Sequence, residues 1–384
     1  MVSAAPATAP PAPAEEMKPA VILSMKHAMN VTSIKNLVAK GQARLNKING
    51  GADIVARDGS GTVINDISSY LAPMSIGGKT WDLIVDTGSS NTWCGAQSRC
   101  EGTSTGKSTG GRVSVSYGSG SFSGSEYTDV VEFGGLTVRS QSIGAASSAQ
   151  GFQGVDGILG LGPVELTEST VSNVNSVPTF MDNLYKQGSI STEVLGVYFA
   201  PVSGSATSAS NGELTLGGVD SSKYSGSLTY LSKARSGSSS PYWGLTFSSF
   251  TLGNTNLGGS NSAGIVDTGT TLIYIPTSAY NKFLSSAASG GTTDYSSGLA
   301  AFNSRPSADF SFTVAGSKFT LSPEQYLVPQ AQYANFGLEQ GKYYAWINDG
   351  GASGVNTIIG QKFLENYYSV YDTTRGRIGF AKRR

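Results

Sequence analysis

Histidine is almost absent from this chain of 384 residues, because His27 is the only one. It lies near the N-terminus, so residues 58–384 cannot form a Ser–His–Asp catalytic triad or a Cys–His catalytic dyad. Two cysteines without a histidine also fall short of the usual zinc ligand set. The chemistry of the body must therefore use carboxylates, hydroxyls, Lys or Arg side chains or backbone groups, and we expect no metal and no other cofactor.

Long apolar runs are absent as well. No stretch of 18 or more apolar residues occurs, so a membrane span is not expected. The formal net charge is zero and no basic stripe with interleaved aromatic residues appears, so nucleic acid is not an expected partner. The first residues also lack the apolar core of a secretion signal, and we expect any such signal to be missing from this sequence.

Cysteine occurs only at Cys94 and Cys100. Because no third cysteine competes, we expect a small-loop disulfide, the alternative being two inert thiols. A disulfide indicates an oxidising compartment, so we expect a secreted protein, with a vacuolar one as the alternative.

Aromatic residues are missing from the N-terminal part, where Tyr70 is the first. Residues 1–57 carry seven Lys or Arg and three Asp or Glu, so the rest of the chain is mildly acidic. The Pro- and Ala-rich residues 1–19 are expected to be disordered. From Thr32 the apolar spacing predicts a basic amphipathic helix, with Gly41 as a candidate break. It could be a surface helix of the main domain, but the charge contrast favours a detachable segment lying across an acidic cleft.

The body is rich in Gly, Ser and Thr and predicts a mostly β protein with short helices. Strands are expected at 81–85, 113–117, 194–199, 213–216, 242–252 and 310–321. Helices are expected at 179–187, 277–287, 322–327 and 361–366. The polar tracts 203–211, 233–240 and 288–298 lack an apolar period and are expected to be exposed loops.

An internal repeat indicates two duplicated lobes. Residues 83–90 read Leu-Ile-Val-Asp-Thr-Gly-Ser-Ser, and residues 264–271 read Gly-Ile-Val-Asp-Thr-Gly-Thr-Thr. Each copy is followed by an apolar–apolar–Gly element, at 158–160 and at 358–360. We expect an N-terminal lobe at 58–228 and a C-terminal lobe at 229–384.

The repeat carries a chemical consequence. One Asp-Thr-Gly turn is weak evidence of function, since turns favour Asp and Gly. Two strand-terminal aspartates in equivalent lobes, Asp86 and Asp267, can meet across a pseudo-two-fold axis. Two carboxylates that share a site retain one proton over a broad acidic range. One can then accept a proton from water while the other donates to a scissile carbonyl oxygen.

The sequence resembles the pepsin-like aspartic proteases, and among them most closely the fungal polyporopepsin type. The resemblance runs through nearly all of residues 60–384. It rests on six ordered motifs: 85–93, 115–124, 156–160, 216–228, 264–269 and 363–372. It implies a bilobal pepsin-like fold of two β-barrel-like lobes with the active-site cleft between them.

The resemblance also implies roles for individual residues. Thr87 and Thr268 would hold an interlocked hydrogen-bond pair beneath the carboxylates. Ser89 and Thr270 would orient the outer carboxylate oxygens, and the backbone of Gly88 and Gly269 would approach them. The mobile hairpin flap over the cleft would carry Tyr117, Gly118 and Ser119, with Trp93 as the partner of the Tyr117 hydroxyl.

The family's prosegment usually plugs the cleft with a lysine that faces the two aspartates. Lys47 lies at a plausible distance for that role, with Lys40, Arg44 and Arg57 as rivals. We expect maturation between residues 50 and 60.

These observations predict an aspartic endopeptidase zymogen that hydrolyses internal peptide bonds at acidic pH. Expected partners are extended polypeptide substrates, the chain's own propeptide and pepstatin-type inhibitors, and we expect a monomer. Phe122, Phe152, Ile158 and Ile273 lie near the motifs, so apolar residues are expected beside the cleaved bond. The alternatives are a catalytically dead binding module, which would show damage in a turn or the flap, and a Gly- and Ser-rich lectin or adhesin.

Overall fold

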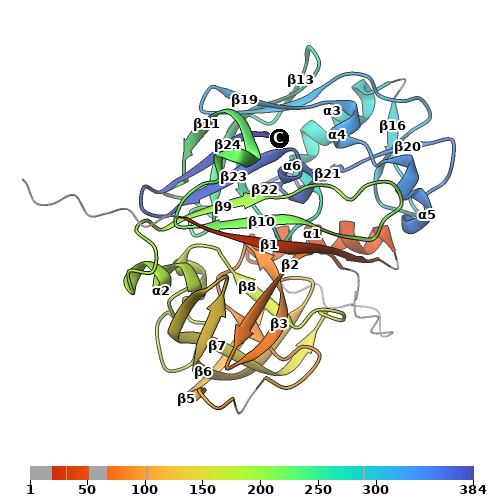
Figure 1. Ribbon diagram of the computed structural model, residues 1–384. Coiled ribbons are helices and arrows are strands. Elements are labelled where there is room, and N and C mark those ends of the chain that lie inside the picture. The colour runs from red at the N-terminus through yellow and green to blue at the C-terminus, as the bar shows by residue number, and fades with distance from the viewer. Residues whose placement is uncertain (1–19, 32, 52–66, 101–102, 289) are drawn as a thin grey trace, which may run out of the picture.

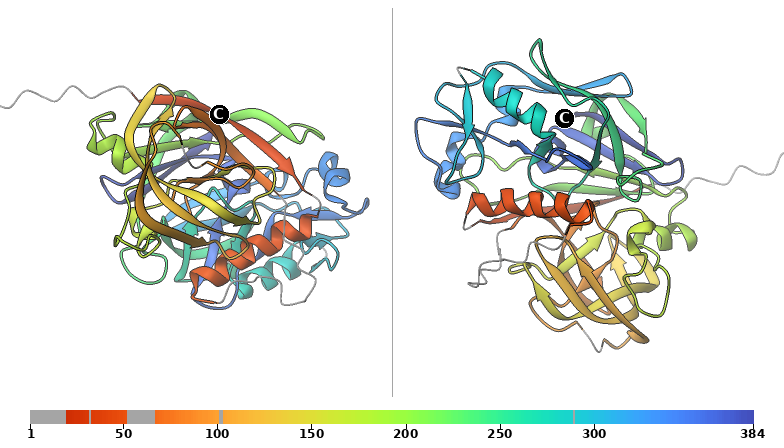
Figure 2. Two further views of the ribbon diagram at one scale, coloured as in Figure 1. Left: turned by 90° about the horizontal axis from the view of Figure 1, so that it is seen from below. Right: turned by 180° about the vertical axis from the view of Figure 1, so that it is seen from behind.

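A computed structural model describes residues 20–31, 33–51, 67–100, 103–288 and 290–384. Two β-rich halves lie above and below helix α1 (Ile34–Ile48), which crosses between them (Figures 1 and 2). The mostly β prediction is confirmed. The expected disorder of 1–19, the rival Arg57 and almost all of the expected maturation region lie outside the described residues.

The first half is a set of mostly antiparallel strands with one covering helix. Its strands are β2 (Ile67–Ile76), β3 (Lys79–Asp86), β4 (Trp93–Cys94), β5 (Lys107–Ser116), β6 (Ser121–Phe133), β7 (Leu136–Gln150) and β8 (Gly157–Gly160). Helix α2 (Phe180–Lys186) begins at a capping box, in which Thr179 and Asp182 each bond to the other's backbone N–H.

The second half repeats this design with more helices. Its strands are β12 (Gly244–Leu252), β13 (Thr255–Gly258), β14 (Ser262–Val266), β15 (Ile273–Ile275), β16 (Gly291–Thr293), β17 (Ala300–Phe302), β18 (Phe310–Val314), β19 (Ser317–Leu321), β20 (Tyr343–Ala345), β21 (Ile347–Asp349) and β22 (Val355–Ile359). Its helices are α3 (Thr277–Ser286), α4 (Pro323–Tyr326), α5 (Tyr333–Phe336) and α6 (Gln361–Leu364). No helix in the described parts of the chain is long and apolar enough to cross a membrane.

A central layer joins the halves. It consists of β1 (Val21–Asn30), β9 (Val194–Tyr198), β10 (Ser208–Leu216), β11 (Tyr224–Ser232), β23 (Tyr367–Asp372) and β24 (Arg377–Arg383). The strand order is β11-β24-β23-β9-β10-β1-β2, which continues into the first half. Strand β1 pairs antiparallel with β10 on one side and with β2 on the other. The N-terminal segment is therefore part of the sheet.

The sequence repeat has a structural counterpart. Strand β3 runs parallel to β8, with Asp86 opposite Gly160, and β4 pairs antiparallel with β8. In the second half β14 runs parallel to β22 and β15 pairs antiparallel with it. Each apolar–apolar–Gly element thus lies between the strand that precedes an aspartate and the strand that follows it.

Four expectations about local structure are corrected. The strand expected at 310–321 is two strands, β18 and β19, and the tract 288–298 is not wholly loop because it contains β16. Helix α1 continues through Gly41. The glycine serves packing instead of ending the helix, because the Tyr274 ring lies against the helix at this residue and a Cβ there would be 2.3 Å from it. The tract 203–211 is not wholly loop, since β10 begins at Ser208. Its polar start is extended because it pairs with β1.

Candidate active site

Asp86 ends β3 and is almost fully buried, 1% exposed. The Gly88 N–H donates to its Oδ1 at 2.9 Å, and the Ser89 hydroxyl donates to its Oδ2. A carboxylate that accepts several hydrogen bonds is held in one orientation and favoured in its charged form. The turn after β3 therefore presents an oriented carboxylate.

Asp267 is arranged in the same way in the second half. It follows β14 and is fully buried. The Gly269 N–H donates to its Oδ1 at 2.8 Å, and the Thr270 hydroxyl donates to its Oδ2 at 2.6 Å. The two predicted turns thus form matching cradles.

The threonines of the two turns bond across the boundary between the halves. The Thr87 N–H donates to Thr268 Oγ1 at 2.8 Å, and the Thr268 N–H donates to Thr87 Oγ1 at 3.0 Å. Each hydroxyl in turn donates to a carbonyl of the opposite half, Val266 or Val85, at 3.2 and 2.8 Å. These four bonds are the interlocked pair that the resemblance implies, and they fix the aspartates relative to each other.

The two glycines allow the turns to approach closely. A Cβ on Gly88 would lie 2.6 Å from Asp267 Oδ1, and one on Gly269 would lie 2.4 Å from Asp86 Oδ1. Any side chain at either position would push the opposite carboxylate away.

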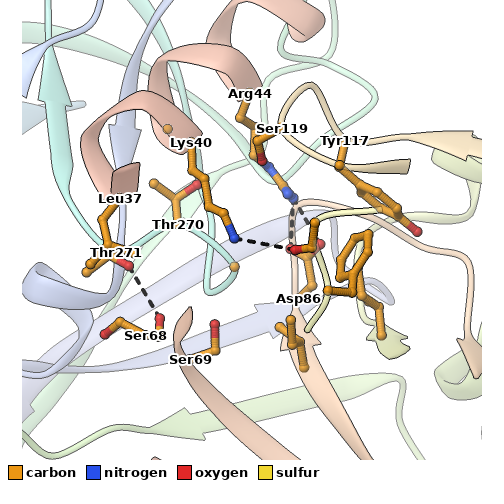
Figure 3. A pocket seen from close by; sticks show the side chains of 17 residues that line it. Leu37, Lys40, Arg44, Ser68, Ser69, Asp86, Tyr117, Ser119, Thr270 and Thr271 are labelled. Atoms are coloured by element: carbon orange, nitrogen blue, oxygen red, sulfur yellow. Dashed lines mark hydrogen bonds and ion pairs between the residues drawn. The ribbon is translucent and has the colours of Figure 1, made fainter. Parts of the chain in front are cut away.

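Arg44 of α1 pairs with both carboxylates, and Figure 3 shows its side chain reaching Asp86. Its Nη2 lies 2.8 Å from Asp86 Oδ1, and its Nε lies 2.8 Å from Asp267 Oδ2. The expectation of Lys47 at this position is therefore corrected to Arg44. Lys47 is one helical turn further on and exposed, and the planar guanidinium reaches two acceptors at once.

The electrostatics of the pair are asymmetric. Burial alone would raise the pKa of Asp86, but the Arg44 charge and the hydrogen bonds from Ser89 and Arg44 bring it below its ordinary value. Burial raises the pKa of Asp267, and the Asp86 charge adds to this against the opposing effect of Arg44. The pKa of Arg44 is raised, because the two carboxylates outweigh its desolvation.

The predicted flap is the turn between β5 and β6. The Tyr117 N–H donates to the Gly120 carbonyl at 2.8 Å, and Gly118 has a positive φ of 85°. A Cβ on Gly118 would lie 2.3 Å from the Ala43 carbonyl, so the flap rests directly on α1. Ser119 lines the same cavity as Tyr117.

The expected Tyr117–Trp93 hydrogen bond is not formed. The indole is near enough to act on the Tyr117 pKa, which burial raises well above its ordinary value. Yet neither the Tyr117 hydroxyl nor the Trp93 Nε1 has a hydrogen-bond partner among the described residues. Trp93 stacks on Phe122 at 4.2 Å, and Tyr117 meets the edge of Phe152 at 5.5 Å. With α1 beneath the flap, these apolar contacts hold Tyr117.

A small cavity of about 70 Å³ remains between α1, the flap and Asp86. Phe152 and Ile158 line it, as expected of residues that flank a substrate. Phe122 lies behind Trp93, and Ile273 belongs to the hydrophobic core, so these two do not line this cavity.

Two supporting residues were not predicted. Gln361 is fully buried at the start of α6, and its Nε2 donates to the Thr268 carbonyl at 2.8 Å. Tyr242 is near enough to Arg44 for its hydroxyl and the guanidinium to act on each other's pKa. The position of Gln361 directly after the second apolar–apolar–Gly element is the only sequence signal that could have indicated its role. No sequence signal marks Tyr242.

The predicted disulfide between Cys94 and Cys100 is present, with Cα atoms 5.9 Å apart. Among the described residues no group of three or more His, Cys, Asp or Glu side chains could hold a metal ion.

The chain is similar to known proteins in family, sequence and structure. Residues 69–383 match the family model described as eukaryotic aspartyl protease. Polyporopepsin of Irpex lacteus is 43% identical over 84% of this chain and 96% of its own length. Rhizopuspepsin of Rhizopus chinensis is 34% identical over 88% and 86%, and pepsin A of Sus scrofa 30% over 82% and 81%. The crystal structure of the Irpex lacteus aspartic proteinase superposes with a TM-score of 0.77, covering 82% of this chain and 94% of that one.

Proposed function

Because this chain belongs to the eukaryotic aspartyl protease family, we propose that Asp86 and Asp267 are the catalytic pair of an endopeptidase made as an inactive precursor. Membership makes the chain a pepsin-like hydrolase of peptide bonds. The observation that carries the finer proposal is Arg44, which bonds both aspartates at 2.8 Å from a helix that precedes the matched family region.

The proposed reaction uses the pair as a unit that holds one proton. The ionised carboxylate accepts a proton from a water molecule, whose oxygen attacks the scissile carbonyl carbon. The protonated carboxyl donates its proton to the carbonyl oxygen. When the C–N bond breaks, a proton passes to the leaving amine, so that no covalent enzyme intermediate forms. The cradles of Ser89 and Thr270 keep both carboxylates oriented throughout.

The substrate in this proposal is an extended polypeptide lying where α1 lies in the precursor, beneath the flap of Tyr117, Gly118 and Ser119. Phe152 and Ile158 support a preference for apolar residues beside the cleaved bond. Pepstatin-type inhibitors would compete for the same space. Asp86 and Asp267 come from the two lobes proposed at 58–228 and 229–384, and the protein would act as a monomer.

Activation by acid follows from the ion pair between Arg44 and Asp86. The pKa of Asp86 is lowered while Arg44 covers it. The ionised Asp86 therefore helps to hold α1 fully at any pH above its ordinary pKa, and this contribution is lost as the pH falls through the lowered pKa. Release would be followed by cleavage between residues 50 and 60. The disulfide supports an oxidising destination, and we propose secretion, with the vacuole as the second candidate.

Casein digestion at acidic pH tests the catalytic proposal. We expect acid-treated protein to digest casein, pepstatin to abolish the activity, and Asp86→Asn to lower the rate by about 10³-fold. Asp82→Asn is the matched control, because Asp82 is an exposed carboxylate on the same strand. Equal rates for Asp86→Asn and wild type, or a rate indifferent to pepstatin, would refute the assignment of the pair.

A further inference from the structure

The only histidine of the chain is buried inside the N-terminal segment. His27 is 0% exposed on β1, opposite Tyr70 of β2 and Ala209 of β10. Its ring stacks on Tyr70, with centroids 4.5 Å apart, and Tyr70 stacks on Phe199 at 3.6 Å. The imidazole is therefore the end ring of a three-ring stack, in which Tyr70 is the middle ring.

The surroundings of the His27 ring do not stabilise its protonated form. Its Nδ1 has no hydrogen-bond partner among the described residues, and Nε2 lies 3.5 Å from the Ser68 hydroxyl. A charged imidazolium needs acceptors at both nitrogens, or a nearby carboxylate, to offset its desolvation. The described surroundings of His27 provide neither.

The charges that face this site make protonation harder. Lys362 of α6 is nearly buried and acts on His27 as a positive charge. Both oxygens of Glu365 bind the Lys362 ammonium, at 2.8 and 3.0 Å, and Oε1 also accepts from the Tyr70 hydroxyl at 3.4 Å. On β10 the carboxylate Glu213 is paired with Lys223, and on β1 itself Lys26 is exposed. The Glu365 carboxylate is thus committed to Lys362 and Tyr70 rather than to His27.

We propose that His27 is a pH sensor that couples its own protonation to the release of β1 from between β2 and β10. The inference rests on the proposed role of the N-terminal segment as a detachable cover. It adds a second acid-sensitive device to that segment, about 17 residues before Arg44 and in a different element.

The direction of the effect follows from linkage. Burial, and then the Lys362 charge, lower the pKa of His27 from 6.5 to about 3 in the folded precursor. In released β1 the ring is solvated and its pKa returns to about 6.5. Above pH 6.5 both states bind no proton and β1 is held fully. As the pH falls from 6.5 towards 3 only the released state takes up the proton, so release becomes about tenfold more favourable per pH unit.

Hydrogen–deuterium exchange of residues 21–30 tests this without using proteolysis. The full chain is studied in an Asp86→Asn background that blocks self-cleavage, alone and with His27→Phe or His27→Gln. Phenylalanine can keep the stack on Tyr70, and glutamine keeps a polar group; neither binds a proton in this range. After correction for intrinsic exchange, we expect protection of the unsubstituted strand, relative to either variant, to fall about tenfold per unit between pH 6 and pH 4.

Lys26→Gln is the matched control, since it removes an exposed positive charge from the neighbouring position and should leave the pH slope unchanged. If β1 protection has the same slope with and without His27, the sensor is refuted. Because casein digestion is measured separately, an active enzyme with unchanged slopes overturns only this inference. An inactive protein that still shows the His27 slope overturns only the catalytic proposal.

Discussion

Glu126 is a carboxyl group inside the first half, 3% exposed on β6. The Ser142 hydroxyl donates to its Oε1, and its Oε2 has no partner among the described residues. Burial raises the pKa of Glu126 to about 7, against the smaller opposing effect of Ser142. The pKa of Glu126 is therefore higher in the folded protein than in the unfolded chain. Its contribution to the free energy of unfolding is complete below about pH 4.5 and falls as the pH rises to 7, by about 3 kcal/mol in all.

We therefore expect Glu126→Gln to flatten the pH dependence of the melting temperature between pH 5 and pH 8, and to melt above wild type at pH 8. Calorimetry across this range measures both. Glu132→Gln, an exposed carboxylate on the same strand, should follow the wild-type curve. A Glu126→Gln curve parallel to wild type would show that Glu126 does not titrate in this range.

At this scale the sequence predicted the meeting of the two aspartates, but not which basic residue of α1 lies against them. Asp86 and Asp267 are marked by a repeated turn, and their backbone cradles follow from the turn itself. Lys40, Arg44 and Lys47 are spaced so that any of them could face the cleft. The docking of α1 brings Arg44 to both aspartates, places Lys40 in the lining of the cavity beside Asp86 and leaves Lys47 exposed. The predicted Tyr117–Trp93 hydrogen bond is absent for a similar reason, because it depends on which element packs beneath the flap.

Among the elements, α1 is held by a close approach that a single methyl group would prevent. Its apolar face packs on the second half through Leu37, Val38 and Leu45, and the Tyr274 hydroxyl donates to the Val38 carbonyl at 2.7 Å. Gly41→Ala should improve the intrinsic helix propensity by about 1 kcal/mol. The added Cβ would nevertheless lie 2.3 Å from the buried Tyr274 ring, and overpacking of this kind costs about 1–3 kcal/mol.

We expect the second effect to prevail, so that Gly41→Ala speeds the loss of the precursor band at pH 5 several-fold on a gel. Gln42→Ala is the control, because Gln42 is exposed one position further on and gains a smaller helix propensity without the clash. Slower loss of the precursor in Gly41→Ala than in Gln42→Ala would mean that Tyr274 yields to the methyl group.

The sequence predicted elements best where their pattern is local. The expected helices at 179–187, 277–287, 322–327 and 361–366 correspond to α2, α3, α4 and α6. Strand β1 was missed because its pairing partners lie far away in the sequence, with Leu23 opposite Leu214. The same distance concealed the start of β10, whose polar residues have no apolar period of their own.

For the whole molecule, β1 is a strand of the central sheet as well as part of the proposed cover. Removing it would leave β2 and β10 each unpaired along one edge, and unpaired strand edges favour aggregation. We expect a chain without residues 1–50 to refold from denaturant in several-fold lower yield than the full chain. Size-exclusion chromatography of the refolded material measures this.

Deletion of residues 1–19 alone is the control, since it leaves β1 and α1 intact and should preserve the yield. Equal recovery from both deletions would show that β2 and β10 can pair without β1, and that the segment acts only as a cover.

The position of Arg44 in the chain has a consequence for the order of synthesis. Domains form from the N-terminus as the ribosome extends the chain at about 5–20 residues per second. Arg44 is made before either aspartate, and Asp267 emerges 181 residues after Asp86. The guanidinium is therefore already part of the chain when the second carboxylate is synthesised. During synthesis of the proposed precursor, the pair is thus never complete without the residue that covers it.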